Sequence, residues 1–122
     1  MNLAEAFTEL ARVSSLQPNW DDEGADPPNA TAIWNAVRVV EWAMSEPALR
    51  VRHIAADVMG GVGVYIHQAA GGHYPYAWVS LDNDGDQAVI VSIGDVDRIW
   101  SSMWTPDAQA ETLGRLRGDK QS

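Results

Sequence analysis

Residues 18–28 read PNWDDEGADPP, a stretch with one Trp, four acidic residues, one Gly and three Pro. Helical periodicity precedes and follows it, so the stretch predicts a fixed elbow between two helices. The side chains of Asn19 and Asp21 can bond nearby backbone N–H groups, and Gly24 can adopt a positive φ. We expect Trp20 to turn inward as a plug of the core, and the acidic side chains to face solvent.

The segment before the elbow predicts a helix over residues 3–15. Apolar residues recur at i, i+4 and i+7 from Leu3 to Leu10, which is the spacing of one helical face. Asn2 can cap this helix, and Glu5 three residues later completes a capping-box pattern.

The segment after the elbow predicts a second helix that starts no earlier than Pro28 and runs to about Met44. Proline at position 28 keeps the preceding residue out of the helical region. The stripe from Ile33 to Val40 is widened by alanines, so we expect this helix to pack against a sheet and the first helix together.

The elbow motif, Asn-Trp-Asp-x-x-Gly-Ala-x-Pro-Pro, resembles one found in a group of small bacterial and prophage proteins, where an apolar helix and an antiparallel sheet follow it. The matching residues are Asn19, Trp20, Asp21, Gly24, Ala25, Pro27 and Pro28. The resemblance covers about the first third of the chain, and the group has no general assigned activity. It implies this fold and an accessory role in phage–host conflict, such as an anti-CRISPR inhibitor or an antitoxin.

After Pro47 the apolar period changes to two, which is typical of strands. A hairpin is predicted around Gly60-Gly61. A three-residue loop over 59–61 would pair Ile54 with Ile66 and give one apolar face, so this register is preferred. The same register would place His53 opposite His67.

A second hairpin is predicted from residues 76–81 and 88–93, with Asp84-Gly85 as a type I′ turn. This pairing sorts the side chains of its strands onto two apolar faces, with Tyr76, Trp78, Val89, Val91 and Ile93 on one and Val79, Leu81 and Ile90 on the other. Either both faces are covered, or one exposes an aromatic patch for a partner.

Two further helices are predicted near the C-terminus. Asp95 can cap a short helix running to Met103, and Thr105 followed by proline is typical of a helix start. The last helix should end near Gly118, before a frayed tail at residues 119–122. The sequence thus predicts one α+β domain over residues 1–118: two N-terminal helices packed on a four-stranded antiparallel meander, closed by one or two C-terminal helices.

The charge balance is the most informative property of the composition. Eight Lys and Arg stand against 17 Asp and Glu, a net charge of −9. Nucleic acids and anionic membranes repel such a surface, so neither is an expected partner, whereas a basic protein surface is. The chain has no Cys, signal-peptide pattern or membrane-spanning apolar run, and we expect a cytoplasmic protein.

No stretch of the sequence predicts catalysis, a cofactor or a bound metal. Asp82-Asn83-Asp84-Gly85-Asp86 resembles the start of a calcium loop, but Gln87 and Ile93 occupy the Gly and bidentate Glu positions. His53, His67 and His73 could approach one another, although cross-strand polar pairing explains them more simply than zinc. No nucleophile elbow or phosphate loop is present.

The expected function is therefore non-enzymatic protein binding, as an inhibitor of a basic or nucleic-acid-binding partner. The alternatives are an antitoxin or immunity protein, a homodimeric structural module, and a histidine-based metal or small-ligand binder. The residues expected to contact the partner lie in two acidic regions and one aromatic face: Asp21, Asp22, Glu23 and Asp26; Asp82, Asp84, Asp86, Asp95 and Asp97; Tyr76 and Trp78.

Overall fold

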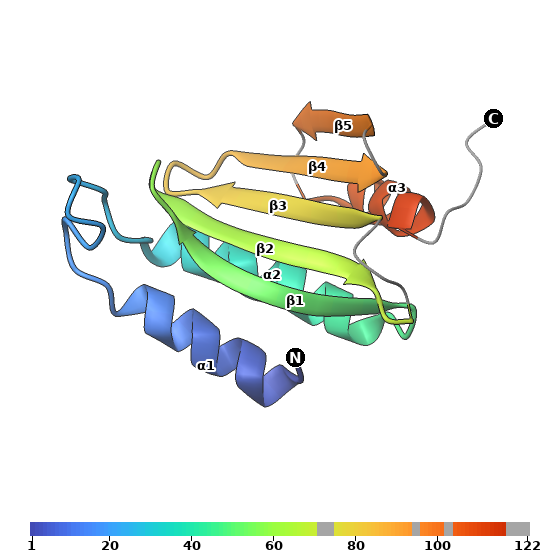
Figure 1. The fold of residues 1–122 in the computed structure, drawn as a ribbon, viewed down its shortest axis with the longest axis horizontal. Helices are drawn as coiled ribbons and strands as arrows, with labels where there is room; N and C mark the ends of the chain where they lie inside the picture. The colour runs from blue at the N-terminus through green and yellow to red at the C-terminus, as the bar shows by residue number, and fades with distance from the viewer. Residues whose placement is uncertain (71–74, 94–95, 102–103, 117–122) are drawn as a thin grey trace.

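The computed structural model of the chain describes residues 1–70, 75–93, 96–101 and 104–116, with the backbone alone for residue 93 and residues 96–101. It confirms an α+β fold with two N-terminal helices and an antiparallel meander (Figure 1). The predicted domain end at 118 and the tail lie outside the described residues. The elements, in chain order, are α1 (Leu3–Ser14), α2 (Ala30–Ser45), β1 (Leu49–Asp57), β2 (Gly61–Gln68), β3 (Tyr76–Asp82), β4 (Gln87–Ile93), β5 (Val96–Ser101) and α3 (Pro106–Leu116).

Each helix begins at a residue that caps it. Asn2 and Glu5 form the expected capping box of α1, with Glu5 N–H donating to Asn2 Oδ1 at 2.8 Å. Asn29 caps α2 by accepting a hydrogen bond from the backbone of Ala32, and the Thr105 hydroxyl oxygen caps α3.

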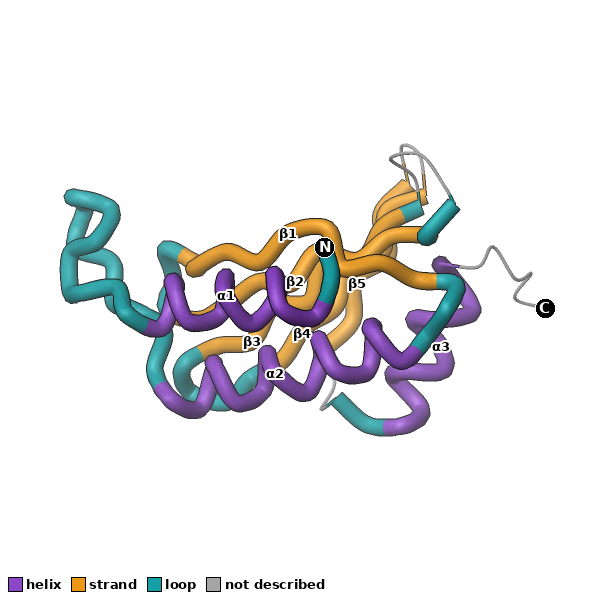
Figure 2. The backbone as a smooth tube through the Cα atoms, turned by 90° about the horizontal axis from the view of Figure 1, so that it is seen from below, coloured by secondary structure: helices purple, strands orange, loops and turns teal. Residues whose placement is uncertain are grey.

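The three helices of the described residues pack on one side of the sheet, and none of them covers the other side (Figure 2). Helix α1 packs on α2 and β1, α2 crosses β1 to β3, and α3 packs on β3 and β4. The core between these layers is aliphatic, and its largest fully buried side chains on the sheet are Val51, Ile54, Val62, Val64, Ile66, Val79, Leu81 and Val89. Burial of these side chains holds the two layers together.

The sheet has the order β1-β2-β3-β4-β5, so the meander is one strand longer than predicted. The helix expected from Asp95 to Met103 is wrong, because Val96–Ser101 is a strand that pairs with β4 from Ile93↔Val96 to Ala88↔Ser101. If Val96–Ser101 were helical, β4 would be the edge of the sheet and would leave backbone groups unpaired. Pairing with β4 satisfies these groups, and this gain outweighs the helical spacing of the apolar residues. One C-terminal helix, α3, closes the described fold.

Both long hairpins turn on the same local sequence, Asp-x-x-Gly. Asp57 and Asp82 each accept a hydrogen bond from the glycine three residues later, at 2.9 and 3.0 Å, and those glycines, Gly60 and Gly85, both have φ of 94°. Each loop therefore has three residues, ending in a left-handed glycine. The type I′ turn predicted at Asp84-Gly85 is wrong, because only the glycine of that pair has a positive φ.

The first hairpin has the predicted loop length but a different register. Its loop is residues 58–60, so Ile54 pairs with Val64 and not with Ile66. A bulge at Arg52 then shifts the pairing by one residue, and Val51 lies opposite Ile66. The predicted apolar face survives because the two registers differ by two residues, which preserves the side on which each side chain lies.

Asn83, in the β3–β4 turn, joins three separate parts of the chain. Its Oδ1 accepts the backbone N–H of Asn29 at 2.9 Å, and its carbonyl accepts from the Asn29 side chain at 2.8 Å. Its Nδ2 donates to the carbonyl of Pro27 at 3.1 Å, and its backbone N–H donates to Gly60 at 3.1 Å. We refer to this set of bonds as the Asn83 clamp.

We predict that Asn83→Ala lowers the free energy of unfolding by about 2 kcal/mol, because it removes the two side-chain bonds to Asn29 and Pro27. Urea denaturation would measure the loss. The control is Thr31→Ala, an exposed change on α2 beside the same turn, which should stay within about 0.5 kcal/mol of the parent. Equal losses for the two variants would show that the clamp does not stabilise the fold.

Candidate functional site

The elbow is held by its own polar groups. The backbone N–H of Asn19 donates to the carbonyl of Ala25 at 2.9 Å, and Asn19 Oδ1 accepts from Gly24 at 2.6 Å. Asn19, Asp22 and Gly24 have φ of 64°, 62° and 85°, a region that Asn, Asp and Gly tolerate best. The loop therefore has a defined shape, and it presents its acidic side chains in fixed places.

Asp21 has a structural role within the elbow. Its Oδ1 accepts the backbone N–H groups of Glu23 and Ala25 at 2.9 and 3.0 Å. These bonds, first that of Ala25 and then that of Glu23, lower the pKa of Asp21, since they favour its charged form. The side chains of Asp22, Glu23 and Asp26 are exposed.

The prediction that Trp20 plugs the core is wrong. Its side chain is half-buried, and it does not belong to the core cluster formed by the described residues. The indole N–H instead donates to the carbonyl of Asp26 at 3.1 Å, within the elbow. The elbow thus bonds its own tryptophan, and the residues of its second half that are buried are Ala25 and Pro28.

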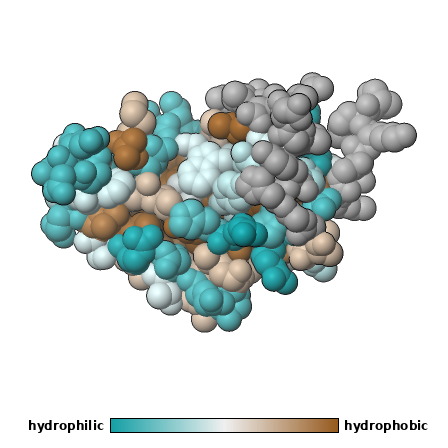
Figure 3. Space-filling view, in the orientation of Figure 1, coloured by the Kyte–Doolittle hydropathy of each residue, from teal (hydrophilic) through white to brown (hydrophobic). Residues whose placement is uncertain are grey.

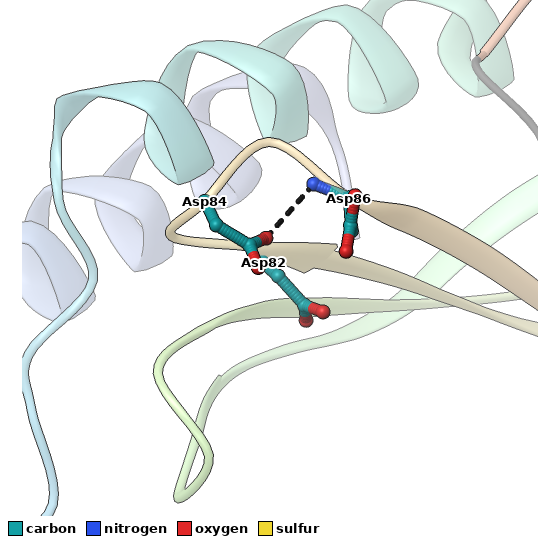
Figure 4. A group of neighbouring side chains, drawn as sticks. All are labelled: Asp82, Asp84 and Asp86. Carbon is teal, nitrogen blue, oxygen red and sulfur yellow. Dashed lines mark hydrogen bonds between the residues drawn. The ribbon is translucent and has the colours of Figure 1, made fainter.

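The β3–β4 turn brings three carboxylates together (Figure 4). Asp82, Asp84 and Asp86 each offer an oxygen within 4.8 Å of the others, and Asp84 Oδ1 accepts the backbone N–H of Asp86 at 3.0 Å. Asp84 and Asp86 are exposed, whereas Asp82 is half-buried and accepts a bond from the Ser80 hydroxyl at 3.3 Å. Exposed acidic groups of this kind are common without a cation. Gln87 and Ile93 also stand where a calcium loop has Gly and a bidentate Glu, so the turn lacks two features of such a loop.

Burial raises the pKa of Asp82, and the neighbouring charges of Asp84, Asp57 and Asp86 add to the effect, while the Ser80 bond opposes it. Asp57 belongs to the β1–β2 turn, so the two turns are close enough for their charges to interact. This contact was not predicted, although the repeated Asp-x-x-Gly sequence was a signal for two similar turns.

The elbow and both hairpin turns lie at the same end of the molecule, where the Asn83 clamp joins them (Figures 1 and 2). We call this the acidic end, defined by Asp21, Asp22, Glu23, Asp26, Asp57, Asp82, Asp84 and Asp86. No Lys or Arg occurs in residues 18–28, 57–61 or 82–86. Hydrophilic colours are prominent at the end from which the elbow projects, with hydrophobic patches beside them (Figure 3).

Two apolar side chains stand exposed at the acidic end. Val58 and Met59, at the tip of the β1–β2 turn, are 58% and 87% exposed. An exposed apolar tip with a rim of charge is the arrangement of many protein-binding surfaces. Sequence reasoning missed these residues because it assigned Val58 to a paired strand.

The remaining acids of the predicted site are elsewhere. Asp97 pairs with Ser92 near the end of β4 that is remote from the β3–β4 turn, so it does not join Asp82, Asp84 and Asp86. Asp95 lies outside the described residues. The acidic residues predicted to form one region beyond the third strand therefore lie near opposite ends of β4.

The predicted approach of the histidines is not found among the described residues. His53 is exposed and lies opposite Tyr65, because the hairpin loop is residues 58–60, and His67 lies opposite Arg50, beyond the bulge at Arg52. Burial lowers the pKa of His67, and the positive charge of Arg52 lowers it further. His73 lies outside the described residues.

The uncovered side of the sheet carries an aromatic face, which we define as Tyr65, Tyr76 and Trp78. The rings of Tyr65 and Tyr76 stack with centroids 4.6 Å apart, and Trp78 meets Tyr65 edge-on at 6.1 Å. All three side chains are half-buried. Tyr76 and Trp78 were predicted here, whereas Tyr65, on the neighbouring strand, was not.

The predicted sorting of the β3 and β4 side chains is wrong for β4. Trp78 pairs with Ile90, and Val79 pairs with Val89, so Val89 faces the helices together with Val79. The three-residue loop of this hairpin shifts the register by one residue from that of the predicted two-residue turn, and such a shift moves every β4 side chain to the other side.

Comparison with family models, curated proteins and solved structures gives no match for this chain. Within the described residues, no helix is long and apolar enough to cross a membrane.

The ring of Trp78 covers Gly63, so substitutions at these two positions should be energetically coupled. A Cβ added to Gly63 would lie 1.8 Å from Cζ2 of Trp78, so we predict that Gly63→Ala costs about 1–3 kcal/mol. Most of that loss should disappear when Trp78→Ala is also present, giving a coupling of at least about 1 kcal/mol in a double-mutant cycle. Trp34, 66% exposed on α2, supplies the control, since Trp34→Ala should add to Gly63→Ala without coupling. Additivity in both cycles would place the Trp78 ring away from Gly63.

Replacement of Asp82 by asparagine is expected to raise stability by an amount that depends on pH. Because its pKa is raised on folding, the folded state binds more protons between the two pKa values, and stability falls as pH rises through that range. Asp82→Asn should therefore raise the free energy of unfolding at pH 7 by a few tenths of a kcal/mol. The gain should shrink as pH falls below the raised pKa, where the parent carboxyl is also neutral.

Urea denaturation of Asp82→Asn and the parent across a pH series would measure this gain. Glu41→Gln, which removes an exposed charge from α2, is the control and should show no such trend. A loss of stability in Asp82→Asn at pH 7 would mean that the Ser80 hydrogen bond outweighs the burial of the charge.

Proposed function

We propose that this protein is a non-enzymatic binding module whose acidic end docks onto a basic surface of a partner protein. The observation that carries the proposal is the convergence of the elbow and the two hairpin turns, which places their carboxylates at the same end of the molecule as the exposed Val58 and Met59. Such a surface complements a basic patch that contains a small apolar depression.

Charge complementarity of this kind favours partners that normally hold nucleic acid, because their binding sites are basic. The resemblance of residues 19–28 to small bacterial and prophage proteins favours an inhibitor in phage–host conflict, such as an anti-CRISPR protein, or an antitoxin. In this proposal the protein acts in the cytoplasm and blocks its partner by occupying the basic surface.

The aromatic face supports a second candidate, a partner or second copy held by Tyr76 and Trp78. Half-buried aromatic side chains on a sheet face without a covering helix are typical anchors of protein interfaces. This surface depends on apolar contact and not on charge, so the two candidates predict different responses to salt.

The test begins with affinity capture of a partner from host lysate, followed by kinetics with the purified pair. The acidic-end variant neutralises three exposed carboxylates whose side chains make no hydrogen bond within the described residues: Asp22→Asn, Glu23→Gln and Asp86→Asn. The control variant removes the same charge from α2, its C-terminus and α3: Glu41→Gln, Glu46→Gln and Asp107→Asn.

The association rate should fall about tenfold between about 0.05 and 0.5 M salt, because screening shortens the reach of the carboxylates. At low salt the acidic-end variant should associate several-fold more slowly than the parent, and the control variant should match the parent. A partner that binds all three proteins alike at both salt concentrations contradicts the proposal. Loss of that binding in Tyr76→Ala would then support the aromatic face.

A further inference from the structure

The sulfur of Met59 is open to solvent, unlike those of the other methionines that the structure describes. Met59 is 87% exposed, more than any other large apolar side chain among the described residues. Met1 and Met44 are half-buried and pack against the core. Met103 lies outside the described residues. Because an oxidant must reach the sulfur of a methionine to react with it, Met59 should be the most reactive of the three.

The β1–β2 turn holds Met59 in this exposed position. The backbone N–H of Met59 donates to Asp57 Oδ1 at 2.9 Å, and that of Gly60 donates to the carbonyl of Asp57 at 2.9 Å. The Gly60 carbonyl accepts the backbone N–H of Asn83 at 3.1 Å. The turn could fold back onto the core only by breaking these bonds, so Met59 stays at the surface.

The groups close to this turn are acceptors of hydrogen bonds. A Cβ added to Gly60 would lie 4.0 Å from Cβ of Asp26, so the elbow reaches the turn that carries Met59. Asp57, two residues before Met59, is itself a carboxylate and belongs to the same turn. An ionised carboxylate has no proton to donate, so neither Asp26 nor Asp57 could satisfy a new acceptor on the Met59 side chain.

We propose that Met59 is a reversible oxidation site that controls docking at the acidic end; this inference rests on the function proposed above. The sulfur attacks one oxygen of hydrogen peroxide, so the S–O bond forms as the O–O bond breaks. A proton then moves to the departing oxygen, and water leaves. The sulfur is oxidised to the sulfoxide and the peroxide is reduced. A thiol-dependent sulfoxide reductase restores the thioether, forming water and a disulfide in the reductase.

Oxidation changes the chemistry of the turn and leaves the fold in place. The sulfoxide oxygen is a polar acceptor, so its burial in an apolar depression of the partner is unfavourable. Met59 does not belong to the core cluster, so the modification should not lower stability. The carboxylates of the acidic end keep their charge, and association should stay fast while dissociation becomes faster.

The chemistry is tested first on the free protein, with hydrogen peroxide as the oxidant and peptide mass spectrometry as the readout. Met59 should be oxidised at least about fivefold faster than Met1 and Met44, because its sulfur is exposed. In concentrated guanidinium chloride, which unfolds the chain, the three should react alike. Urea denaturation of the oxidised protein should match that of the parent. Equal rates in the folded protein would overturn the proposal.

The effect on docking is measured with the purified partner, after catalase has removed the peroxide. Oxidation of this protein should raise the dissociation rate about tenfold and change the association rate less than about twofold. Treatment with the sulfoxide reductase should reverse the effect. Met59→Leu keeps an apolar side chain without sulfur, so its affinity should be the same before and after peroxide. Met44→Leu is the matched control and should respond to peroxide as the parent does.

The outcomes separate this inference from the function on which it rests. If the acidic-end variant weakens the complex and Met59 oxidation does not, the oxidation switch alone is wrong. A peroxide effect that persists in Met59→Leu would also overturn the switch, since it would belong to another residue. A partner that binds the acidic-end variant like the parent contradicts the proposed function and the switch together.

Discussion

The reciprocal bonds between Asn83 and Asn29 are the constraint on which the arrangement of this protein depends. Asn29 caps α2 with its side-chain oxygen while its amide group bonds to the carbonyl of Asn83. One asparagine pair therefore fixes where α2 starts and where the β3–β4 turn lies. The further bond from Asn83 to Gly60 adds the β1–β2 turn. The pairing of Gly61 with Asp82 already places the two turns side by side, and the bonds from Asn83 to Asn29 and Pro27 join the elbow to them.

The sequence allowed the parts of the fold that depend on local chemistry to be predicted. Asn2 with Glu5, and Thr105 before Pro106, each fix a helix boundary through neighbours within a few residues. The sheet was less predictable, because a hairpin register depends on where a three-residue loop begins, and a bulge such as that at Arg52 has no sequence signature. Residues 96–101 have helical spacing, yet their structure is decided by pairing with β4.

The candidate site shows the same division. The acidic residues of the elbow and of the β3–β4 turn were recognisable as charged loops, whereas their convergence rests on contacts between residues 54 and 56 positions apart. The inward turn of Trp20 was inferred from its hydrophobicity alone, but a loop with its own carbonyl acceptor satisfied the indole N–H near the surface.

The bulge at Arg52 also affects how the molecule behaves at high concentration. Strand β1 is the first strand of the sheet, so no described strand pairs with one side of its backbone, which another chain could approach. A bulge interrupts the regular spacing of those open groups, and exposed Arg50 and Arg52 place like charges where two such edges would meet. The bulge at Arg52 thus protects this edge against intermolecular sheet formation and fibrillar aggregation.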